Sequence, residues 1–559
     1  MARCTGTPFD YIMQRGAMIR NTSLLLRRAL ERLYIFPNLK GGGSSGDGNN
    51  NKRGNGFEGA TVLDAHAGIH RNVGVLDFSA MYPSIIRAHN LCYSTIVLDP
   101  ANEPEQTFRV GAHCFVPVEV VKGLIPEVVE ILQDCRSKAK KAYAAATDPI
   151  KKKTCKAREL AFKVAGNSMY GAMGSRQSLI PLLEVAETVT AIGRNDIKNV
   201  KRIAEEMYPD ALVVYGDTDS VFVRFCMPPD VVTVIDSVSL SMDMARALAA
   251  KVNLTMKFPK SIEFEKIYST MICLSKKRYA GVMYAAGHKF GEEPPIDIKG
   301  MQCVRRDGCS LMRDLVRDCL MSILYTGTFT EAAALARLRL IEVMDDKIPV
   351  EAYAVQKVLR KSMQDCCFPM TTSQVATIKK ALGSTTTITT QELSYAEQDE
   401  AIRKKVPLPW RLKIRLPHVM LAWRMRMKDP GNAPVLGETI TYIVTNNGGK
   451  QIFEKVNTLE DVKTKKLFVD RRYYLDSLRV PLENIFLPVC IQMFAPNNNS
   501  ASPMQRKQNE ARGKLEVENL IWRVIKSRTL KYDAVSRRES IESSPIVQAF
   551  KRAHAAKNH

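Results

Sequence analysis

The chain has 559 residues, enough for several domains, and 45% of them are hydrophobic, which supports packed cores. Lys and Arg number 81 against 58 Asp and Glu, and the formal net charge of +23 indicates a polyanionic partner. A ribosomal or chromatin protein could carry the same charge. No signal peptide and no long apolar span is found, which argues against a membrane protein and predicts an intracellular one.

The 13 cysteines form no Cys-x-x-Cys pair. Their scatter along the chain, with Cys366 and Cys367 adjacent, predicts reduced and mostly buried thiols. No zinc or iron–sulfur module is expected.

The first 56 residues divide into two parts. Residues 1–40 contain only two acids, Asp10 and Glu31. Residues 41–56 are rich in Gly, Ser and Asn, which predicts a flexible linker. We expect the first 40 residues to form a segment that packs near the sheet predicted from the residues that follow.

An apolar run at residues 73–78 has Asp77 near its end, and Pro83 lies in the segment 79–86 that follows. Because proline suits the first turn of a helix, we predict a strand, a sharp turn after Asp77 and then a helix. Backbone N–H groups at such a turn bind anions, and a triphosphate is a candidate. The alternative is an aspartate that only caps a helix.

Two basic helices are predicted next, at residues 123–146 and after Asp148-Pro149, which breaks the chain between them. Basic residues four apart share a face of the first helix, and three positions share a face of the second. An antiparallel pair can present these faces to a triphosphate, although ordinary surface charge is the alternative. The residues on the two faces are Arg136, Lys140, Lys163, Asn167 and Tyr170.

Residues 212–223 form two β-rich runs around the acidic tip Asp217-Thr218-Asp219, which predicts a β-hairpin. Carboxylates this close together repel one another unless a cation lies between them, and Mg²⁺ prefers oxygen ligands. If Asp77 meets this tip, three carboxylates can hold two metal ions for phosphoryl transfer. A solvated acidic turn is the alternative.

The last part of the chain contains a basic stretch and an amphipathic helix. Residues 402–428 hold nine Lys or Arg and no acid, which suits either a surface that follows a phosphate backbone or the basic edge of a packed subdomain. Beyond residue 496, a polar linker precedes a helix that we expect to pack against its own chain in preference to a partner. Its apolar face consists of Val517, Leu520, Ile521 and Val524.

Several of these segments resemble motifs of family B DNA polymerases. Residues 77–86 are similar to motif A, residues 163–171 to motif B and residues 215–220 to motif C. The Lys-Lys-Arg-Tyr run at residues 276–279 is similar to that family's primer-binding motif. The resemblance extends from about residue 4 to about residue 496. Segments that resemble eukaryotic polymerase delta and herpesvirus-type enzymes are 89–95, 299–307 and 429–434.

The resemblance implies a role for each matching residue. Asp77 and Asp219 would ligate two Mg²⁺ ions together with the Phe78 carbonyl, and Asp217 would complete the catalytic acidic tip. Tyr82 would lie under the sugar and exclude a 2′-OH, so deoxynucleotides are the implied substrate. The residues implied to bind the nucleotide are Ser79, Ala80, Met81, Tyr82, Arg136, Lys140, Lys163, Asn167 and Tyr170. Those implied to bind DNA are Lys276, Lys277, Arg278 and Tyr279.

Ala80 and Met81 stand where the family usually has Ser and Leu. The family's contacts there are made largely through the backbone, so activity should survive this departure. Side-chain packing beneath the incoming nucleotide would change, and we expect fidelity to change with it.

The implied fold is α+β, a right-hand polymerase with an antiparallel-sheet palm, helical-hairpin fingers and a mostly helical thumb. Its implied reaction is the template-directed addition of deoxynucleotides to a primer 3′-OH in DNA replication. The implied divisions are a segment near the palm (1–40), a linker (41–56), the palm (57–117 and 177–300), the fingers (118–176), the thumb (301–496), and a polar linker with a basic tail (497–559).

The implied partners are primer–template DNA and deoxynucleoside triphosphates, and the nucleus or a viral replication site would be the place of action. Polymerases of this family usually carry a proofreading exonuclease upstream, and the residues before the palm are too few to form it. We therefore expect a split, truncated or fragmentary enzyme without its own exonuclease, served by a separate exonuclease chain or a processivity factor. Two alternatives stay open: an inactive polymerase-like scaffold that binds DNA, and an enzyme that makes RNA or reverse-transcribes it.

Overall fold

The computed structural model describes residues 1–36, 59–60, 62–98, 107–175, 178–179, 181–285, 287–288, 290–383, 393–409, 412–495, 501–523 and 525. The linker predicted at residues 41–56 and the basic tail lie outside these residues. Helices and antiparallel strands are mixed along the chain, which confirms the α+β class. No helix in the described ranges is both long enough and apolar enough to cross a membrane.

A seven-stranded antiparallel sheet forms the centre of the fold. Its longest strands, β2 and β8, are neighbours, and β2 lies between β7 and β8, so the strand that carries Asp77 near its end is paired on both sides. In spatial order the strands are β1 (Val62–Leu63), β6 (Leu212–Asp217), β7 (Ser220–Arg224), β2 (Gly68–Phe78), β8 (Ile262–Ser275), β9 (Arg278–Ala285) and β10 (Ile296–Lys299).

Helices cover one face of this sheet. Side chains alternate between the two faces along a strand, so Val221 and Val223 of β7 point to the same core as the helices. The other face carries Val75, Phe222 and Tyr215 in a separate cluster. The covering helices are α7 (Leu183–Met207) and α8 (Val234–Asn253), and α4 (Met81–Ala88) packs against α7 in the same core.

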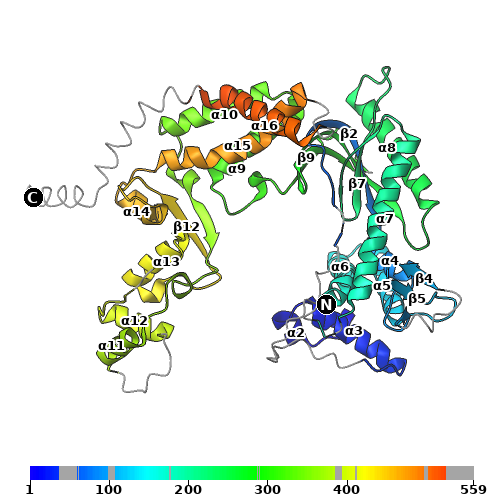
Figure 1. The fold of residues 1–559 in the computed structure, drawn as a ribbon, viewed down its shortest axis with the longest axis horizontal. Coiled ribbons are helices and arrows are strands. Elements are labelled where there is room, and N and C mark those ends of the chain that lie inside the picture. The colour runs from blue at the N-terminus through cyan, green and yellow to red at the C-terminus, as the bar shows by residue number, and fades with distance from the viewer. Residues whose placement is uncertain are drawn as a thin grey trace, which may run out of the picture.

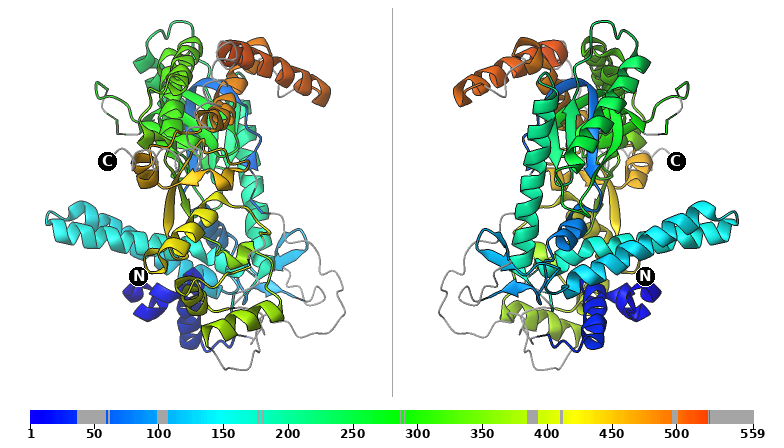
Figure 2. Two further views of the ribbon diagram at one scale, coloured as in Figure 1. Left: turned by 90° about the vertical axis from the view of Figure 1, so that its left-hand side faces the viewer. Right: turned by 90° about the vertical axis from the view of Figure 1, so that its right-hand side faces the viewer.

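The two predicted basic helices form an antiparallel hairpin, α5 (Leu124–Ala145) and α6 (Pro149–Met173). The predicted break at Asp148 is confirmed, because its carboxylate accepts hydrogen bonds from the backbone N–H groups of Ile150 and Lys151 and caps α6. Such a cap stabilises a helix by about 1 kcal/mol. The hairpin projects from the side of the molecule (Figure 2). A small sheet, β3 (Ile96–Val97), β5 (His113–Phe115) and β4 (Phe108–Val110), precedes it in the chain.

The first residues pack against the helical hairpin. They form α1 (Ala2–Thr5), α2 (Phe9–Gln14) and α3 (Ala17–Glu31), and the main contacts of α3 are with α6 and α5. Leu25 and Ala29 of α3 also join the hydrophobic core that includes β2 and β7 of the sheet. Asn21 of α3 donates a hydrogen bond to Ser168 of α6 (3.0 Å). Arg28 and Arg32 both pair with Glu127 of α5. The segment therefore fixes the base of the hairpin.

A largely helical lobe follows the sheet in the chain. Its upper part packs four helices around one core, α9 (Ser310–Thr326), α10 (Thr330–Met344), α15 (Arg471–Phe494) and α16 (Pro503–Val517). Its lower part contains α11 (Thr372–Leu382), α12 (Tyr395–Arg403), α13 (Pro417–Lys428), α14 (Leu459–Thr464) and a sheet of β11 (Val355–Val358), β12 (Thr439–Val444) and β13 (Val456–Asn457). Figure 1 shows this lower part on the left, and the region that holds α3 to α7 on the right, as two arms below a shared upper region.

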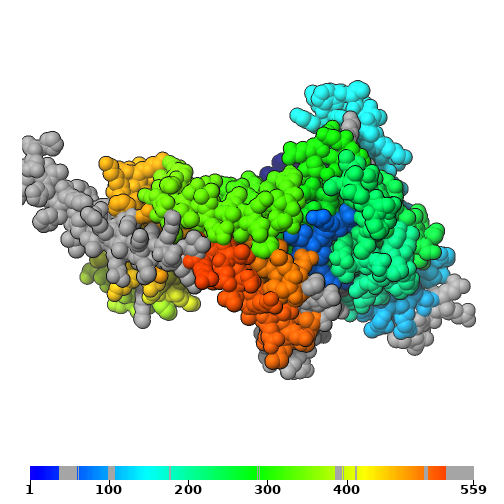
Figure 3. All heavy atoms as spheres, turned by 90° about the horizontal axis from the view of Figure 1, so that it is seen from above, coloured from blue at the N-terminus to red at the C-terminus, as the bar shows by residue number. Residues whose placement is uncertain are grey.

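The amphipathic helix predicted near the C-terminus packs on its own chain, as expected. Val517 and Ile521 are buried in the core of the helical lobe, and the backbone carbonyl of Leu520 accepts a hydrogen bond from Arg337 of α10 (3.0 Å). Seen from above, α9 and α10 lie beside α15 and α16 in one continuous body (Figure 3). Val524, the last position of the predicted face, lies outside the described residues.

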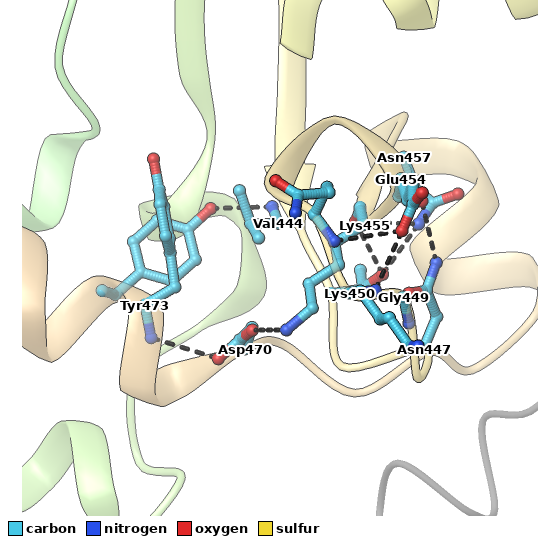
Figure 4. Close-up of polar contacts among 12 residues, drawn as sticks. Val444, Asn447, Gly449, Lys450, Glu454, Lys455, Asn457, Asp470 and Tyr473 are labelled. Carbon is cyan, nitrogen blue, oxygen red and sulfur yellow. Dashed lines mark hydrogen bonds and ion pairs between the residues drawn. The ribbon is translucent and has the colours of Figure 1, made fainter. Parts of the chain in front are cut away.

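A polar network ties the β12–β13 hairpin to the start of α15 (Figure 4). Asp470 caps α15 by accepting from the backbone N–H of Tyr473 (3.1 Å), and its second oxygen binds the Lys455 ammonium (2.9 Å). The backbone N–H of Val444 donates to the Tyr474 hydroxyl (3.0 Å). The small sheet and the long helix are therefore held as one unit.

A side chain of the helical lobe forms hydrogen bonds with the central sheet, in addition to the core that the two share. Gln492 of α15 accepts a hydrogen bond from the backbone N–H of Ile69 (2.6 Å) and donates one to the Ile69 carbonyl (2.9 Å). Gly68 has a φ of 138°, and a Cβ there would lie 2.5 Å from the Gln492 side chain. A glycine is therefore required at residue 68 for this contact.

Candidate active site

The structure brings Asp77 to the predicted acidic hairpin. Asp77 lies one residue before the end of β2 and is opposite Ser220 of β7 and Glu263 of β8. The backbone N–H of Phe78 donates to the carbonyl of Asp219 (2.8 Å). The strand end and the hairpin tip are thus joined by backbone hydrogen bonds.

The tip itself is a tight turn between β6 and β7. Thr218 has a φ of 60°, and the N–H of Asp219 donates to the carbonyl of Asp217 (2.6 Å). The carboxylate of Asp217 binds the Lys277 ammonium (3.2 Å) and accepts from the Thr218 hydroxyl (3.1 Å). Asp217 is therefore partly neutralised by a lysine, whereas Asp219 is not paired with it in this way.

Charges of like sign are concentrated at Asp77. Burial raises the pKa of Asp77 to about 7, and the charges of Asp219 and Glu265 add to the shift. Lys163 and Lys266 act in the opposite direction. Lys163 of α6 is therefore close enough for its charge to act on Asp77.

Sequence reasoning missed two further carboxylates, Glu263 and Glu265 of β8. Glu263 accepts a hydrogen bond from the Ser79 hydroxyl (2.8 Å), and Glu265 contributes, after burial, to the raised pKa of Asp219. The signal was present, because two acids two residues apart on a strand point to the same side. Nothing in the sequence alone indicated that this strand would lie beside Asp77.

The acidic side chains are close enough to repel one another, yet they do not form a closed cage. Within the described residues, no three His, Cys, Asp or Glu side chains are near enough to hold a metal ion together. The donor set nonetheless suits a hard divalent cation, because it consists of oxygens whose mutual repulsion a cation would relieve.

The turn after Asp77 exposes the start of α4. Ala80 has a φ of 48° and precedes the first helical residue, Met81. The first backbone N–H groups of a helix have no partner inside it, so those of Met81 and Tyr82 are available to an anion. The N–H of Ser79 is already used, since it donates to the carbonyl of Ser261 (2.9 Å).

Two tyrosines from different elements form one wall of the site. The rings of Tyr82 on α4 and Tyr170 on α6 have centroids 4.4 Å apart and are inclined by 42°. Burial raises the pKa of Tyr82 to about 12, so its hydroxyl is protonated at neutral pH. Met81 points away into the core and is 5% exposed.

The predicted basic cluster on the hairpin is only partly free. Lys163 and Asn167 are exposed on the same face of α6 as Tyr170, and Lys140 is exposed on α5. Arg136 is engaged instead, because its Nε lies 3.6 Å from a carboxylate oxygen of Glu159 on α6.

The Lys-Lys-Arg-Tyr run forms the turn between β8 and β9. Lys276 binds the backbone carbonyl of Val62 (2.9 Å), and the N–H of Lys277 donates to the buried Tyr215 hydroxyl (2.8 Å). Tyr279 packs against Tyr215 with ring centroids 6.0 Å apart. The turn therefore lies directly on the acidic hairpin. Arg278, which begins β9, is half-buried and lies opposite Ser275 in the register of β8 and β9.

These features agree with a comparison against known families. The sequence model for the family described as DNA polymerase family B matches residues 7–489. The chain belongs to DNA polymerase family B. The match includes all of the strand end, helical hairpin, acidic turn and Lys-Lys-Arg-Tyr turn just described.

Individual members of family B align over most of the chain. The DNA polymerase delta catalytic subunit of Candida albicans is 32% identical over 504 residues, covering 88% of this chain and 42% of that protein. The corresponding subunits of Oryza sativa subsp. japonica and Mesocricetus auratus are 32% and 33% identical, each covering 88% of this chain and 40% of the relative. The chain thus spans about two-fifths of the length of the curated relatives it matches.

Proposed function

We propose that this chain catalyses template-directed DNA synthesis, adding deoxynucleotides to a primer 3′-OH in DNA replication. The observation that carries the proposal is the meeting of Asp77 with the acidic hairpin in the sheet, where the charge of Lys163 of the helical hairpin also acts. Membership of family B supports this chemistry. In this proposal the sheet region (57–117 and 177–300) is the palm, the hairpin region (118–176) the fingers and the helical lobe (301–496) the thumb.

Asp77, Asp219 and the Phe78 carbonyl would hold the divalent cation, which we propose to be Mg²⁺, as two ions. When bound, such ions supply charge that activates an attacking hydroxyl and stabilises a leaving oxygen. Asp217 stays paired with Lys277 and completes the acidic tip. The raised pKa of Asp77 means that its proton must leave before the carboxylate can bind a cation.

The incoming deoxynucleoside triphosphate would lie between α4 and α6. The N–H groups of Met81 and Tyr82 can bind its phosphates from one side, and the exposed Lys163 and Asn167 can bind them from the other. The ring of Tyr82, packed against Tyr170, would form a steric wall at the sugar. Primer DNA would contact the Lys-Lys-Arg-Tyr turn, whose position on the acidic hairpin brings the primer end to the carboxylates.

Primer extension tests the proposal directly. The protein is incubated with a labelled primer–template, Mg²⁺ and the four deoxynucleotides, beside an Asp219→Ala variant. We expect extension by the wild-type chain, none by the variant, and equal DNA binding by both, because binding depends mainly on Lys and Arg contacts to phosphate. A wild-type chain that binds DNA without extending it would be the inactive scaffold instead, and preference for ribonucleotides would indicate an RNA-synthesising enzyme.

We further propose that the 559 residues synthesise DNA without 3′→5′ proofreading. Two-metal nuclease chemistry needs a second cluster of carboxylates, and residues 1–56 contain only Asp10, Glu31 and Asp47. A separate exonuclease chain or processivity factor is a proposed partner. The relatives from yeast, rice and hamster favour the nucleus over a viral replication site as the place of action.

A further inference from the structure

One acid lies within the face of α6 that we assign to the triphosphate. Glu159 precedes Lys163 by four residues, so the two side chains are neighbours on the helix surface. The sequence predicts a basic surface on the hairpin, because α5 carries Arg136 and Lys140 and α6 carries Lys163. In the structure, Glu159 forms an ion pair with one of these cations. Its Oε1 lies 3.6 Å from the Arg136 Nε on the other helix of the hairpin.

The two contacts of Glu159 differ in strength. Its Oε2 accepts a hydrogen bond from the Lys156 ammonium at 2.7 Å, whereas Arg136 is almost an ångström farther from Oε1. Lys156 is also held over the ring of Tyr143, 5.5 Å from its centroid. The bond to Lys156 lowers the pKa of Glu159, so the carboxylate is ionised. The looser partner, Arg136, is the one that can leave.

If Arg136 leaves Glu159 for the triphosphate, neither side chain is left without a partner of opposite charge. The side chain of Glu159 is 12% exposed, and a carboxylate so enclosed needs a cation nearby. Lys156 stays bound when Arg136 departs, so Glu159 remains paired. Arg136, which is 32% exposed, gains more from phosphate oxygens, because a guanidinium binds them through two parallel hydrogen bonds.

We propose that Glu159 is a competitor for Arg136 that an incoming nucleoside triphosphate must displace. The inference rests on the proposed function, because it takes Arg136 as a ligand of the triphosphate. In the nucleotide-free protein, Glu159 holds the guanidinium of Arg136. The triphosphate of every nucleotide must displace Glu159 before it can bind Arg136, which lowers the affinity for the nucleotide. Because the exchange concerns the triphosphate alone, the loss of affinity is the same for nucleotides with correct and mismatched bases.

Glu159→Gln tests the competition, since glutamine keeps the shape and removes the charge. Single-turnover incorporation is measured against deoxynucleotide concentration for the wild type and the variant. We expect the apparent nucleotide dissociation constant to fall by about two- to fivefold, the range of a partly exposed ion pair, with an unchanged maximal rate. Glu159→Asp, which retains the charge, should stay close to the wild type.

Two controls separate competition from general effects. Asp134→Asn removes the same charge from an exposed position of α5 and should leave the nucleotide affinity unchanged. In an Arg136→Ala background, Glu159→Gln should have no effect, because the competitor then has nothing to compete for. Equal gains with Asp134→Asn, or a full gain without Arg136, would overturn the inference, as would an unchanged or weaker affinity of Glu159→Gln.

The test is kept independent of the proposed function by a second measurement. Equilibrium binding of a deoxynucleoside triphosphate to the protein without DNA is compared for the same variants. Tighter binding by Glu159→Gln in a chain that extends no primer would keep the inference and refute the polymerase proposal. If the wild type extends the primer but Glu159→Gln changes neither measurement, the polymerase proposal stands and the inference about Glu159 is refuted.

Discussion

Asp77 is held in an environment that disfavours its charged form. It is half-buried at a strand end, and Asp219 and Glu265 add negative charge nearby. Because the cause is electrostatic repulsion together with lost hydration, this residue should lower the stability of the protein whenever no cation is bound. Sequence reasoning reached Asp77 and the hairpin through spacing, but it could not detect the strength of this repulsion.

Asp77→Asn should therefore stabilise the cation-free protein at high pH. The folded-state pKa of about 7 lies above the ordinary unfolded value of about 3.9, so between these values the native state binds more protons than the unfolded state. Stability then falls as pH rises from 4 to 7. We expect a gain on the order of 1 kcal/mol at pH 8, after discounting for solvent screening, and none at pH 4.

Thermal melting in a chelator at both pH values provides the measurement. The exposed Asp10 offers a matched control, because Asp10→Asn makes the same substitution outside the acidic site and should not reproduce the gain at pH 8. Added Mg²⁺ should raise the melting temperature of the wild type more than that of Asp77→Asn. A variant that melts below the wild type at pH 8 in chelator would contradict the repulsion.

Tyr82→Val should increase ribonucleotide use. The ring of Tyr82 is fixed against Tyr170, so it cannot easily move aside for a 2′-OH, and valine removes most of that wall. Tyr82→Phe keeps the ring and should keep the preference. Competition between ribo- and deoxynucleotides in primer extension measures the ratio, and equal ratios for the valine and phenylalanine variants would place the sugar discrimination elsewhere.

At the scale of elements, the α5–α6 hairpin was predicted closely because its signals are local. Helix periodicity, Pro126 near one start and Asp148-Pro149 at the break all act within a few residues. The acidic hairpin was predicted for the same reason. The contacts that join elements were not predicted, since the pairing of Arg136 with Glu159 or of Asp217 with Lys277 depends on packing between distant segments.

The position of the N-terminal helices is a second case of this limit. The sequence predicted a segment near the sheet but not its contacts with the hairpin, where α3 (Ala17–Glu31) buries Leu25 and Ala29 in the core shared with the sheet. Its pairing with Glu127 of α5 was equally hidden, because the partners Arg28 and Arg32 are about a hundred residues away. Long-range ion pairs leave no pattern in a single sequence.

Glu127→Gln should loosen α3 from the hairpin. The side chain of Glu127 accepts from two arginines and is 12% exposed, so its loss removes both ion pairs at once. We expect faster amide hydrogen exchange across residues 17–31, with a stability loss of about 1 kcal/mol. Glu130→Gln is the control, because Glu130 pairs with Arg87 and Lys122 and its loss should leave α3 exchange unchanged.

At the scale of the whole molecule, carboxylates are distributed unevenly. The cluster around Asp77 lies in the central sheet, whereas residues 1–36 contribute only Asp10 and Glu31, on two different helices. Two acids so separated cannot form a second two-metal centre. Residues 1–36 therefore offer no second two-metal centre of the kind that we propose at Asp77.

A mismatched primer terminus should therefore persist when the purified 559-residue protein is incubated with Mg²⁺ and no nucleotides. The label is placed at the 5′ end, and the length of the primer is followed over time. We expect slow extension of the mismatch once nucleotides are added, without prior shortening. Shortening from the 3′ end that survives in the Asp219→Ala variant would show a nuclease centre elsewhere in the chain.

The amide of Gln492 has a consequence for motion. It satisfies both backbone groups of Ile69 in the way a neighbouring strand would, and it fits only because Gly68 has no side chain. From Ile69, β2 continues to Asp77 with two irregularities, a left-handed residue at Asn72 (φ 57°) and a register shift between Val75 and Leu76. A rotation of α15 at this joint must either break the two hydrogen bonds or move the start of β2. A closure of the helical lobe that keeps both hydrogen bonds and the position of β2 therefore has its pivot beyond α15, toward α11–α14.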